Sequence, residues 1–110
     1  MAAIKIYRGD TWQRAWIIKD GAGNPVDLTG AAARLHVRDA DGVKVMEAST
    51  ADGRLTLQSA AGRIDLVMPA SATAVAPASY RFDIEVTYPS GVRITYEQAT
   101  LLVMEDMSRD

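Results

Sequence analysis

Residues 80–97 read YRFDIEVTYPSGVRITYE, and they give the clearest structural signal in the chain. Apolar and polar residues alternate on both sides of the sequence Pro89-Ser90-Gly91. A period of two places one set of side chains against a core and the other set toward solvent. The proline and the glycine suit a tight turn of three residues. The stretch therefore predicts a β-hairpin that belongs to an antiparallel sheet with one buried face.

The turn also predicts the register of this hairpin. Tyr88 opposite Val92 leaves three residues in the loop and brings apolar side chains opposite apolar ones. The same count places Asp83 opposite Glu97, and two like charges that face each other destabilise a strand pair. Either Arg81 relieves this repulsion, or a β-bulge interrupts the pairing near Glu97.

Short runs of the same kind recur along the chain between turn-forming residues. Glycine, asparagine and aspartate tolerate positive φ, and proline presets a turn, so the separators between these runs have a physical cause. We expect strands at Ala3–Tyr7, Thr11–Lys19, Ala32–Arg38, Val43–Ala48, Arg54–Gln58, Arg63–Met68, Tyr80–Tyr88 and Val92–Met104. Only Pro69–Val75 reads as a helical turn, because a proline opens it and Pro77 closes it.

The turn at Asp41-Gly42 leaves two registers open. A two-residue turn aligns Val37 with Met46, whereas a three-residue turn aligns Val37 with Val45. Both alignments bring apolar residues together, so the sequence alone does not separate them.

Short antiparallel strands with one apolar face each bury those faces best as two sheets packed face to face. We therefore predict an all-β fold, an immunoglobulin-like β-sandwich of about 7–8 antiparallel strands, with a small β-barrel as the alternative. A chain of 110 residues is long enough for one such domain. We expect residues 1–104 to form this domain and residues 105–110 to form a polar C-terminal tail.

Composition narrows the classes of function. The sequence holds no cysteine, which excludes disulfides and thiolate metal sites. The net charge is −2, with acidic and basic residues interspersed, so no basic surface for nucleic acid is expected. No apolar run approaches the roughly 18 residues that a membrane-spanning helix needs. We therefore predict neither nucleic-acid binding nor membrane insertion.

The polar residues do not form a known catalytic or metal-binding pattern. His36 is the sole histidine, and no motif supplies it with a nucleophile. Asp83, Glu85 and Glu97 lie at hairpin positions that normally face solvent, although glycosidases use such carboxylates. Asp39-Ala40-Asp41-Gly42 resembles the beginning of a calcium loop but lacks the later acidic ligand. We predict no enzyme, no catalytic residue, no cofactor and no metal site.

Trp12 and Trp16 lie four residues apart in one expected strand, so both rings point to the same face. Exposed rings would form a stacking platform for a sugar, whereas buried rings would supply core packing, which their usual burial favours. Arg14 lies between them on this face and indicates a sheet edge or an interface.

Arg8-Gly9-Asp10 is the tripeptide that integrin receptors recognise, but its place between two expected strands favours a turn.

Several short motifs carry a resemblance to a known family. They are Arg8-Gly9-Asp10-Thr11-Trp12, Trp16-Ile17-Ile18-Lys19-Asp20, Gly23-Asn24-Pro25-Val26-Asp27-Leu28-Thr29-Gly30-Ala31 and Ala78-Ser79-Tyr80-Arg81-Phe82-Asp83-Ile84-Glu85-Val86. Together they resemble the N-terminal β-sandwich domain of phage baseplate upper proteins and related small phage tail proteins. One departure is that Ala78-Ser79 replaces the glycine-containing start of that family's penultimate strand.

The resemblance implies a non-enzymatic phage or prophage structural protein of the tail or baseplate region. Such a protein acts as an assembly or adaptor module through protein–protein contacts with other tail and baseplate proteins, and with its own copies in a homo-oligomer. It is synthesised in the bacterial host cytoplasm and located in the tail of the virion. Edge strands carry unpaired backbone groups, so we expect the interface at the first strand or beside it. The expected interface residues are Ile4, Ile6, Arg8 and Arg14. The alternative is a carbohydrate-binding or adhesive immunoglobulin-like module.

Overall fold

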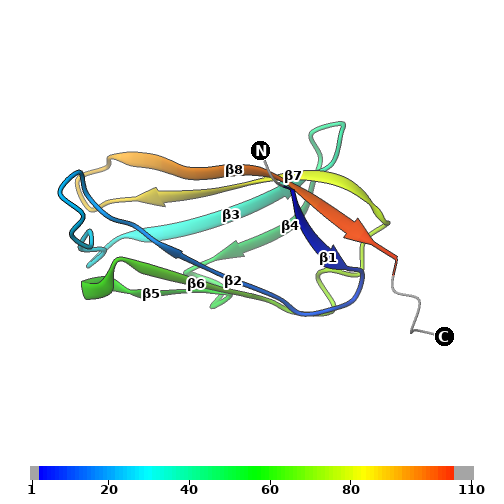
Figure 1. Cartoon of the computed structure of the whole chain (residues 1–110), viewed down its shortest axis with the longest axis horizontal. Helices are drawn as coiled ribbons and strands as arrows, with labels where there is room; N and C mark the ends of the chain where they lie inside the picture. Colours follow the sequence, from blue (N-terminus) through cyan, green and yellow to red (C-terminus); the bar gives the residue numbers. More distant parts are fainter. Residues whose placement is uncertain (1–2, 106–110) are drawn as a thin grey trace.

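A computed structural model describes residues 3–105 and confirms the all-β sandwich (Figure 1). Within this range the strands are β1 (Ile4–Tyr7), β2 (Trp12–Ile17), β3 (Ala32–Arg38), β4 (Lys44–Ser49), β5 (Leu55–Gln58), β6 (Arg63–Met68), β7 (Ala78–Thr87) and β8 (Arg93–Met104), with a 3₁₀ turn at Ser59–Ala61. Every strand overlaps one that the alternation predicts. Apart from Glu105, the predicted polar tail lies outside the described residues.

The strands form a five-stranded sheet in the order β1-β8-β7-β3-β4 and a three-stranded sheet in the order β2-β6-β5. β1 runs parallel to β8, and the other neighbours are antiparallel. The second sheet matches strands B, E and D of an immunoglobulin-type sandwich, and β4, β3, β7 and β8 match strands C′, C, F and G. The immunoglobulin-like prediction is therefore confirmed, and two separate sheets take the place of the closed barrel.

A tyrosine near the start of β7 gives independent support for this fold. Tyr80 is buried, and its hydroxyl donates a hydrogen bond of 2.5 Å to the carbonyl oxygen of Ala76. A tyrosine that bonds back to the backbone a few residues upstream, at the start of strand F, is a hallmark of immunoglobulin-type sandwiches. The bond holds the connection from β6 to β7 against the body of the molecule.

The helical turn predicted at Pro69–Val75 does not form a helix. The Ala72 amide donates to the carbonyl oxygen of Pro69 at 2.9 Å and closes a single turn. Thr73 is fully buried, and its hydroxyl donates to the carbonyl oxygen of Asp10 at 2.7 Å. This bond ties the turn to the loop between β1 and β2, and both segments close one end of the sandwich.

The core lies between the facing sides of the two sheets. Trp12 is 4% exposed and Trp16 is 9% exposed, so the core position expected for both rings is confirmed and neither forms an exposed sugar platform. Trp12 meets Phe82 edge to face, with ring centroids 5.5 Å apart. The largest fully buried apolar side chains are Leu28, Leu35, Leu55, Ile64, Leu66, Met68, Ile84 and Leu101. Burial of each such side chain contributes roughly 1.5–3 kcal/mol to folding.

The β7–β8 hairpin has the predicted turn. The Tyr88 amide donates to the carbonyl oxygen of Val92 at 2.8 Å, which leaves three residues in the loop. Farther from the turn the register shifts, and Ile84 faces Glu97 because Tyr96 is an extra residue in β8. Of the two expected solutions to the charge conflict, the structure adopts the β-bulge.

The β3–β4 hairpin combines both registers that the sequence left open. The Asp39 amide donates to the carbonyl oxygen of Val43 at 2.9 Å, so this loop also has three residues. Val37 nevertheless faces Met46, because the register shifts once and Val45 is the extra residue. The loop length of one alternative and the strand pairing of the other are therefore both present.

Gly62 has little room for a side chain. Its φ is +62°, and a Cβ would lie 2.5 Å from the carbonyl oxygen of Ile18 and 3.0 Å from that of Val26. Gly91 has a φ of +89° but open space around its Cα.

We expect Gly91→Ala to lower the free energy of unfolding by about 1–2 kcal/mol, the cost of a left-handed residue with a side chain. Gly62→Ala adds a backbone clash and should cost about 3 kcal/mol or more in urea denaturation. Equal losses would contradict this packing.

The hydroxyls of Tyr88 and Tyr96 are hydrogen-bonded across the hairpin. Burial, and to a smaller degree this bond, raise the pKa of Tyr88 to about 12. The neutral form of the Tyr88 phenol is therefore more strongly favoured in the folded chain than in the unfolded chain, so it stabilises the fold. This stabilisation is present below about pH 10, the ordinary pKa of tyrosine, and is lost as the pH rises toward 12.

Subtracting the phenolate absorbance titration of a Tyr88→Phe variant from that of the unmodified chain isolates the Tyr88 phenol. We expect this phenol to ionise near pH 12, and Tyr96→Phe should lower its pKa only part of the way because burial is the larger cause. A Tyr88 titration centred near pH 10 in the unmodified chain would contradict the arrangement.

Candidate docking surface

The bulge in β8 turns Glu97 toward the inside of the sandwich. Before the bulge the even-numbered side chains of β8 lie on the core side, and after it the odd-numbered ones do. Asp83 faces Gln98 as a result, so the two carboxylates do not oppose each other. The alternation of the hairpin predicts Glu97 on the solvent face, and the structure corrects this, since the Glu97 side chain is 30% exposed and reaches the other sheet.

Glu97 joins the two sheets at one flank. Its carboxylate oxygens lie 3.0 and 3.1 Å from Arg14 Nη2, and one of them accepts a hydrogen bond of 2.8 Å from Trp16 Nε1. The Arg14 guanidinium also lies 5.5 Å from the centroid of the Trp16 ring. Arg14 does lie in an edge strand, because β2 ends the three-stranded sheet. Its charge is paired within the chain.

Removal of the Glu97 carboxylate should weaken the contact between the two sheets at this flank. Glu97→Ala leaves the Arg14 guanidinium and the Trp16 indole without their acceptor, and we expect a loss of about 1–3 kcal/mol in the free energy of unfolding. Glu97→Gln keeps an oxygen for the indole and should cost less. Glu85→Ala is the matched control, because Glu85 is 3.9 Å from Arg93 on the outer face and should change stability by no more than about 0.5 kcal/mol. Equal losses in Glu97→Ala and Glu85→Ala would show that the bridge has no special role.

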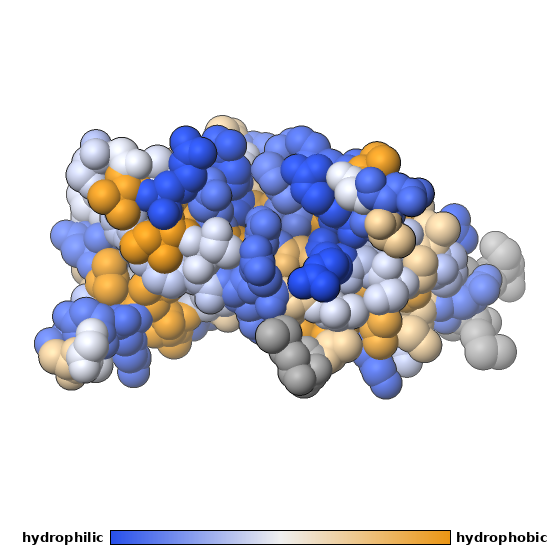
Figure 2. All heavy atoms as spheres, turned by 90° about the horizontal axis from the view of Figure 1, so that it is seen from above, coloured by the Kyte–Doolittle hydropathy of each residue, from blue (hydrophilic) through white to orange (hydrophobic). Residues whose placement is uncertain are grey.

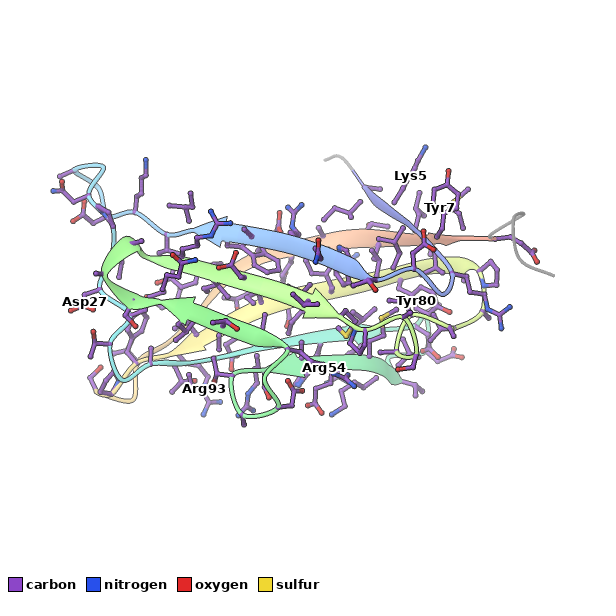
Figure 3. All side chains as sticks on the ribbon, turned by 90° about the horizontal axis from the view of Figure 1, so that it is seen from below. Lys5, Tyr7, Asp27, Arg54, Tyr80 and Arg93 are labelled. Atoms are coloured by element: carbon purple, nitrogen blue, oxygen red, sulfur yellow. The ribbon has the colours of Figure 1, made fainter. Side chains whose placement is uncertain are left out.

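β1 is an edge strand of the five-stranded sheet, as expected for the first strand. Ile6 is 8% exposed and Ile4 is half-buried against the core. Arg8 is exposed, and its amide donates to the end of β8 at 2.8 Å. The exposed side chains of β1 are Lys5 and Tyr7, which project from the strand away from the sandwich (Figure 3).

The backbone of β1 has a paired side and an unpaired side. Successive residues of a strand direct their amide and carbonyl groups to opposite sides, and Arg8 directs its amide to β8. Ile4 and Ile6 therefore also bond toward β8, whereas the backbone groups of Lys5 and Tyr7 point away from it. The Tyr7 carbonyl oxygen accepts a hydrogen bond of 3.0 Å from the Asp10 amide, so the unpaired groups are the amide and carbonyl of Lys5 and the amide of Tyr7. No strand between residues 3 and 105 lies on that side of β1.

Apolar side chains accompany this unpaired backbone. Tyr7 is 55% exposed and pairs in register with Met104, which is 40% exposed. Leu102 lies next to Lys5 in the same register and is half-buried. We call these four residues, Lys5, Tyr7, Leu102 and Met104, the β1 corner. It combines unpaired backbone groups with exposed apolar side chains.

Other sheet edges carry features that hinder pairing with another chain. At β4, Arg54 Nη1 donates to the Glu47 carbonyl oxygen at 2.9 Å, and Asp52 accepts from the Ser49 amide at 3.1 Å. The bulge interrupts the part of β8 that β1 leaves uncovered, and β2 carries the inward-pointing charge of Arg14. β5 is as short as β1 but has no large exposed apolar side chain. The β1 corner therefore remains as the candidate docking surface.

Asp39, the first residue of the calcium-like sequence, acts as a turn residue, and so does Asp20. Asp39 Oδ1 accepts hydrogen bonds of 2.9 Å from the amides of Asp41 and Val43. Asp20 Oδ1 accepts from the amides of Ala22 and Asn24 in the same way. Across residues 3–105, no three histidine, aspartate or glutamate side chains form a group that could hold a metal ion.

The residues weighed for catalysis lie mainly on the outer face of the five-stranded sheet. His36 Nε2 is 3.1 Å from Glu47, and Lys44 Nζ is 3.0 Å from the same carboxylate. The hydrogen bond from Lys44 and its charge, with a smaller contribution from His36, hold the pKa of Glu47 below its usual value. Asp83 and Glu85 are half-buried on this face.

Within the described part of the chain, no helix has the length and apolar character needed to cross a bilayer.

Comparisons with known proteins support the fold alone. Neither the protein-family models nor the curated proteins give a match to this sequence. Among solved structures, the chain is similar to CopC from Methylosinus trichosporium OB3b, with a TM-score of 0.58 and 14% identity, over 100% of this chain and 91% of that one. It is also similar to extracellular domains 3–5 of Drosophila OTK, with a TM-score of 0.41 and 17% identity, over 94% of this chain and 33% of that one. The likeness to CopC shows a shared β-sandwich architecture.

Proposed function

We propose that the chain is a non-enzymatic assembly or adaptor module of a phage or prophage tail or baseplate, and that it docks onto a neighbouring tail protein through the β1 corner. The family resemblance of the turn motifs supports the first part of this proposal. The second part rests on one observation, the unpaired backbone groups of β1 beside the exposed Tyr7 and Met104 side chains.

Strand addition is the contact for which this surface is suited. An extended segment of a partner laid beside β1 would bond to the amide and carbonyl of Lys5 and to the amide of Tyr7, and it would extend the five-stranded sheet. Its side chains on the outer face would cover Tyr7 and Met104, and aromatic residues and methionine are enriched in protein interfaces. Lys5 is exposed and would pair with an acidic residue at the rim of such a contact.

A charge at the centre of the β1 corner should prevent docking. In a strain that produces the phage particle, we expect Tyr7→Asp to lower the amount of the chain incorporated into purified particles about tenfold, because docking would bury an unpaired carboxylate. Mass spectrometry of the particles measures the incorporation. Val67→Asp is the matched control, since Val67 is 48% exposed on the outer face of the other sheet.

Three results would count against the proposal. The absence of the chain from particles would exclude the tail role, and so would a gene neighbourhood made of metabolic genes alone. Equal incorporation of the Tyr7→Asp variant and the unmodified chain would exclude the β1 corner while leaving the tail role in place. Thermal unfolding of both variants shows whether the folded state is intact in each case.

A further inference from the structure

The outer face of the five-stranded sheet carries a shallow hollow of about 300 Å³. The loop between β3 and β4, which rises from the sheet in Figure 1, lines one side of this hollow. Figure 2 shows that hydrophilic side chains cover the middle of this face. The side chains that line the hollow and carry polar groups are His36, Arg38, Asp39, Arg81, Asp83 and Gln98. This volume is at the lower end of the range for small-molecule sites.

Two arginines face each other across this hollow. Arg38 in β3 and Arg81 in β7 are register partners, and both side chains are exposed on the outer face. The Arg38 side chain donates to the carbonyl oxygen of Gly42 at 3.0 Å, and the Arg81 side chain forms no hydrogen bond or ion pair within residues 3–105. Like charges directly opposite each other destabilise a strand pair. A carboxylate placed between them would remove this repulsion, because guanidinium groups bind carboxylates with two parallel hydrogen bonds.

The other end of the hollow carries a different chemistry. Asp83 is half-buried between His36 and Gln98 in the register, and among the described residues its carboxylate has no hydrogen-bond or ion-pair partner. A free carboxylate accepts hydrogen bonds from hydroxyl groups, and the Gln98 amide both donates and accepts. The negative charge of Asp83 disfavours a ligand that is anionic throughout. The hollow is therefore suited to a ligand with one carboxylate and several hydroxyl groups.

We infer that this hollow binds an acidic sugar residue, whose carboxylate lies between Arg38 and Arg81 and whose hydroxyls bond to Asp83 and Gln98. This inference is independent of the proposed tail role. The buried tryptophans supply no stacking platform, so affinity rests on hydrogen bonds and one charge interaction. The dissociation constant for a single sugar is on the order of 1 mM.

Titration with D-glucuronate, followed by the amide resonances of the ¹⁵N-labelled chain, tests the inference. We expect chemical shift changes confined to residues 36–42, 81–83 and 98. D-glucose, which lacks the carboxylate, and acetate, which lacks the hydroxyls, should each bind at least about tenfold more weakly at the same ionic strength. Arg81→Ala and Asp83→Asn should each weaken glucuronate binding about tenfold.

Arg34→Ala is the matched control, because Arg34 lies on the same face of β3 and faces Glu85 rather than another cation. It should leave glucuronate binding unchanged. The inference is overturned if glucuronate at about 20 mM gives no changes around the hollow, or if Arg34→Ala weakens binding as much as Arg81→Ala. Equal binding of acetate would show a simple carboxylate site, of the kind that an acidic peptide also occupies, and would equally overturn it.

Discussion

The two sheets are joined at one flank by a carboxylate of β8 that holds a guanidinium and an indole of β2. This contact lies where both strands lack a further neighbour, so it replaces the closure that an additional strand would give. It depends on a backbone irregularity, because only the extra residue Tyr96 turns Glu97 inward. The burial of Trp16, the position of the charged Arg14 inside an apolar face, and the interruption of the β8 edge all follow from this one arrangement.

The alternation of apolar residues predicted the strands because each has one buried face, and that pattern is local. It could not predict the contact between Arg14 and Glu97, since these residues are 83 positions apart and the pattern of one segment contains no information about the other. A signal for it was nevertheless present. The register that the turn imposed placed Glu97 opposite Asp83, and the apolar face of β2 contained an arginine. Each conflict resolves the other, but only after the bulge reverses the side-chain direction.

The candidate docking surface was predicted as a strand but not as a set of side chains. The position of the first strand in the pattern predicts an edge strand, but it does not predict which side chains of that strand are accessible. Ile4 and Ile6 belong to the face that packs on the core, and the accessible part of β1 consists of the side chains of Lys5 and Tyr7 and the backbone groups of Lys5. The hollow between Arg38 and Arg81 required the pairing of β3 with β7, which no short-range pattern contains.

The parallel pairing of β1 with β8 has a mechanical consequence. A force applied to the N-terminal end of β1 and to the C-terminal end of β8 pulls the two strands in opposite directions along their length. The hydrogen bonds between these strands then bear the load together and must break almost at once, rather than one after another as in an unzipping hairpin. Resistance to stretching is thus a property of this end of the domain, and the strand that leaves its outer backbone unpaired is also the one that would carry tension.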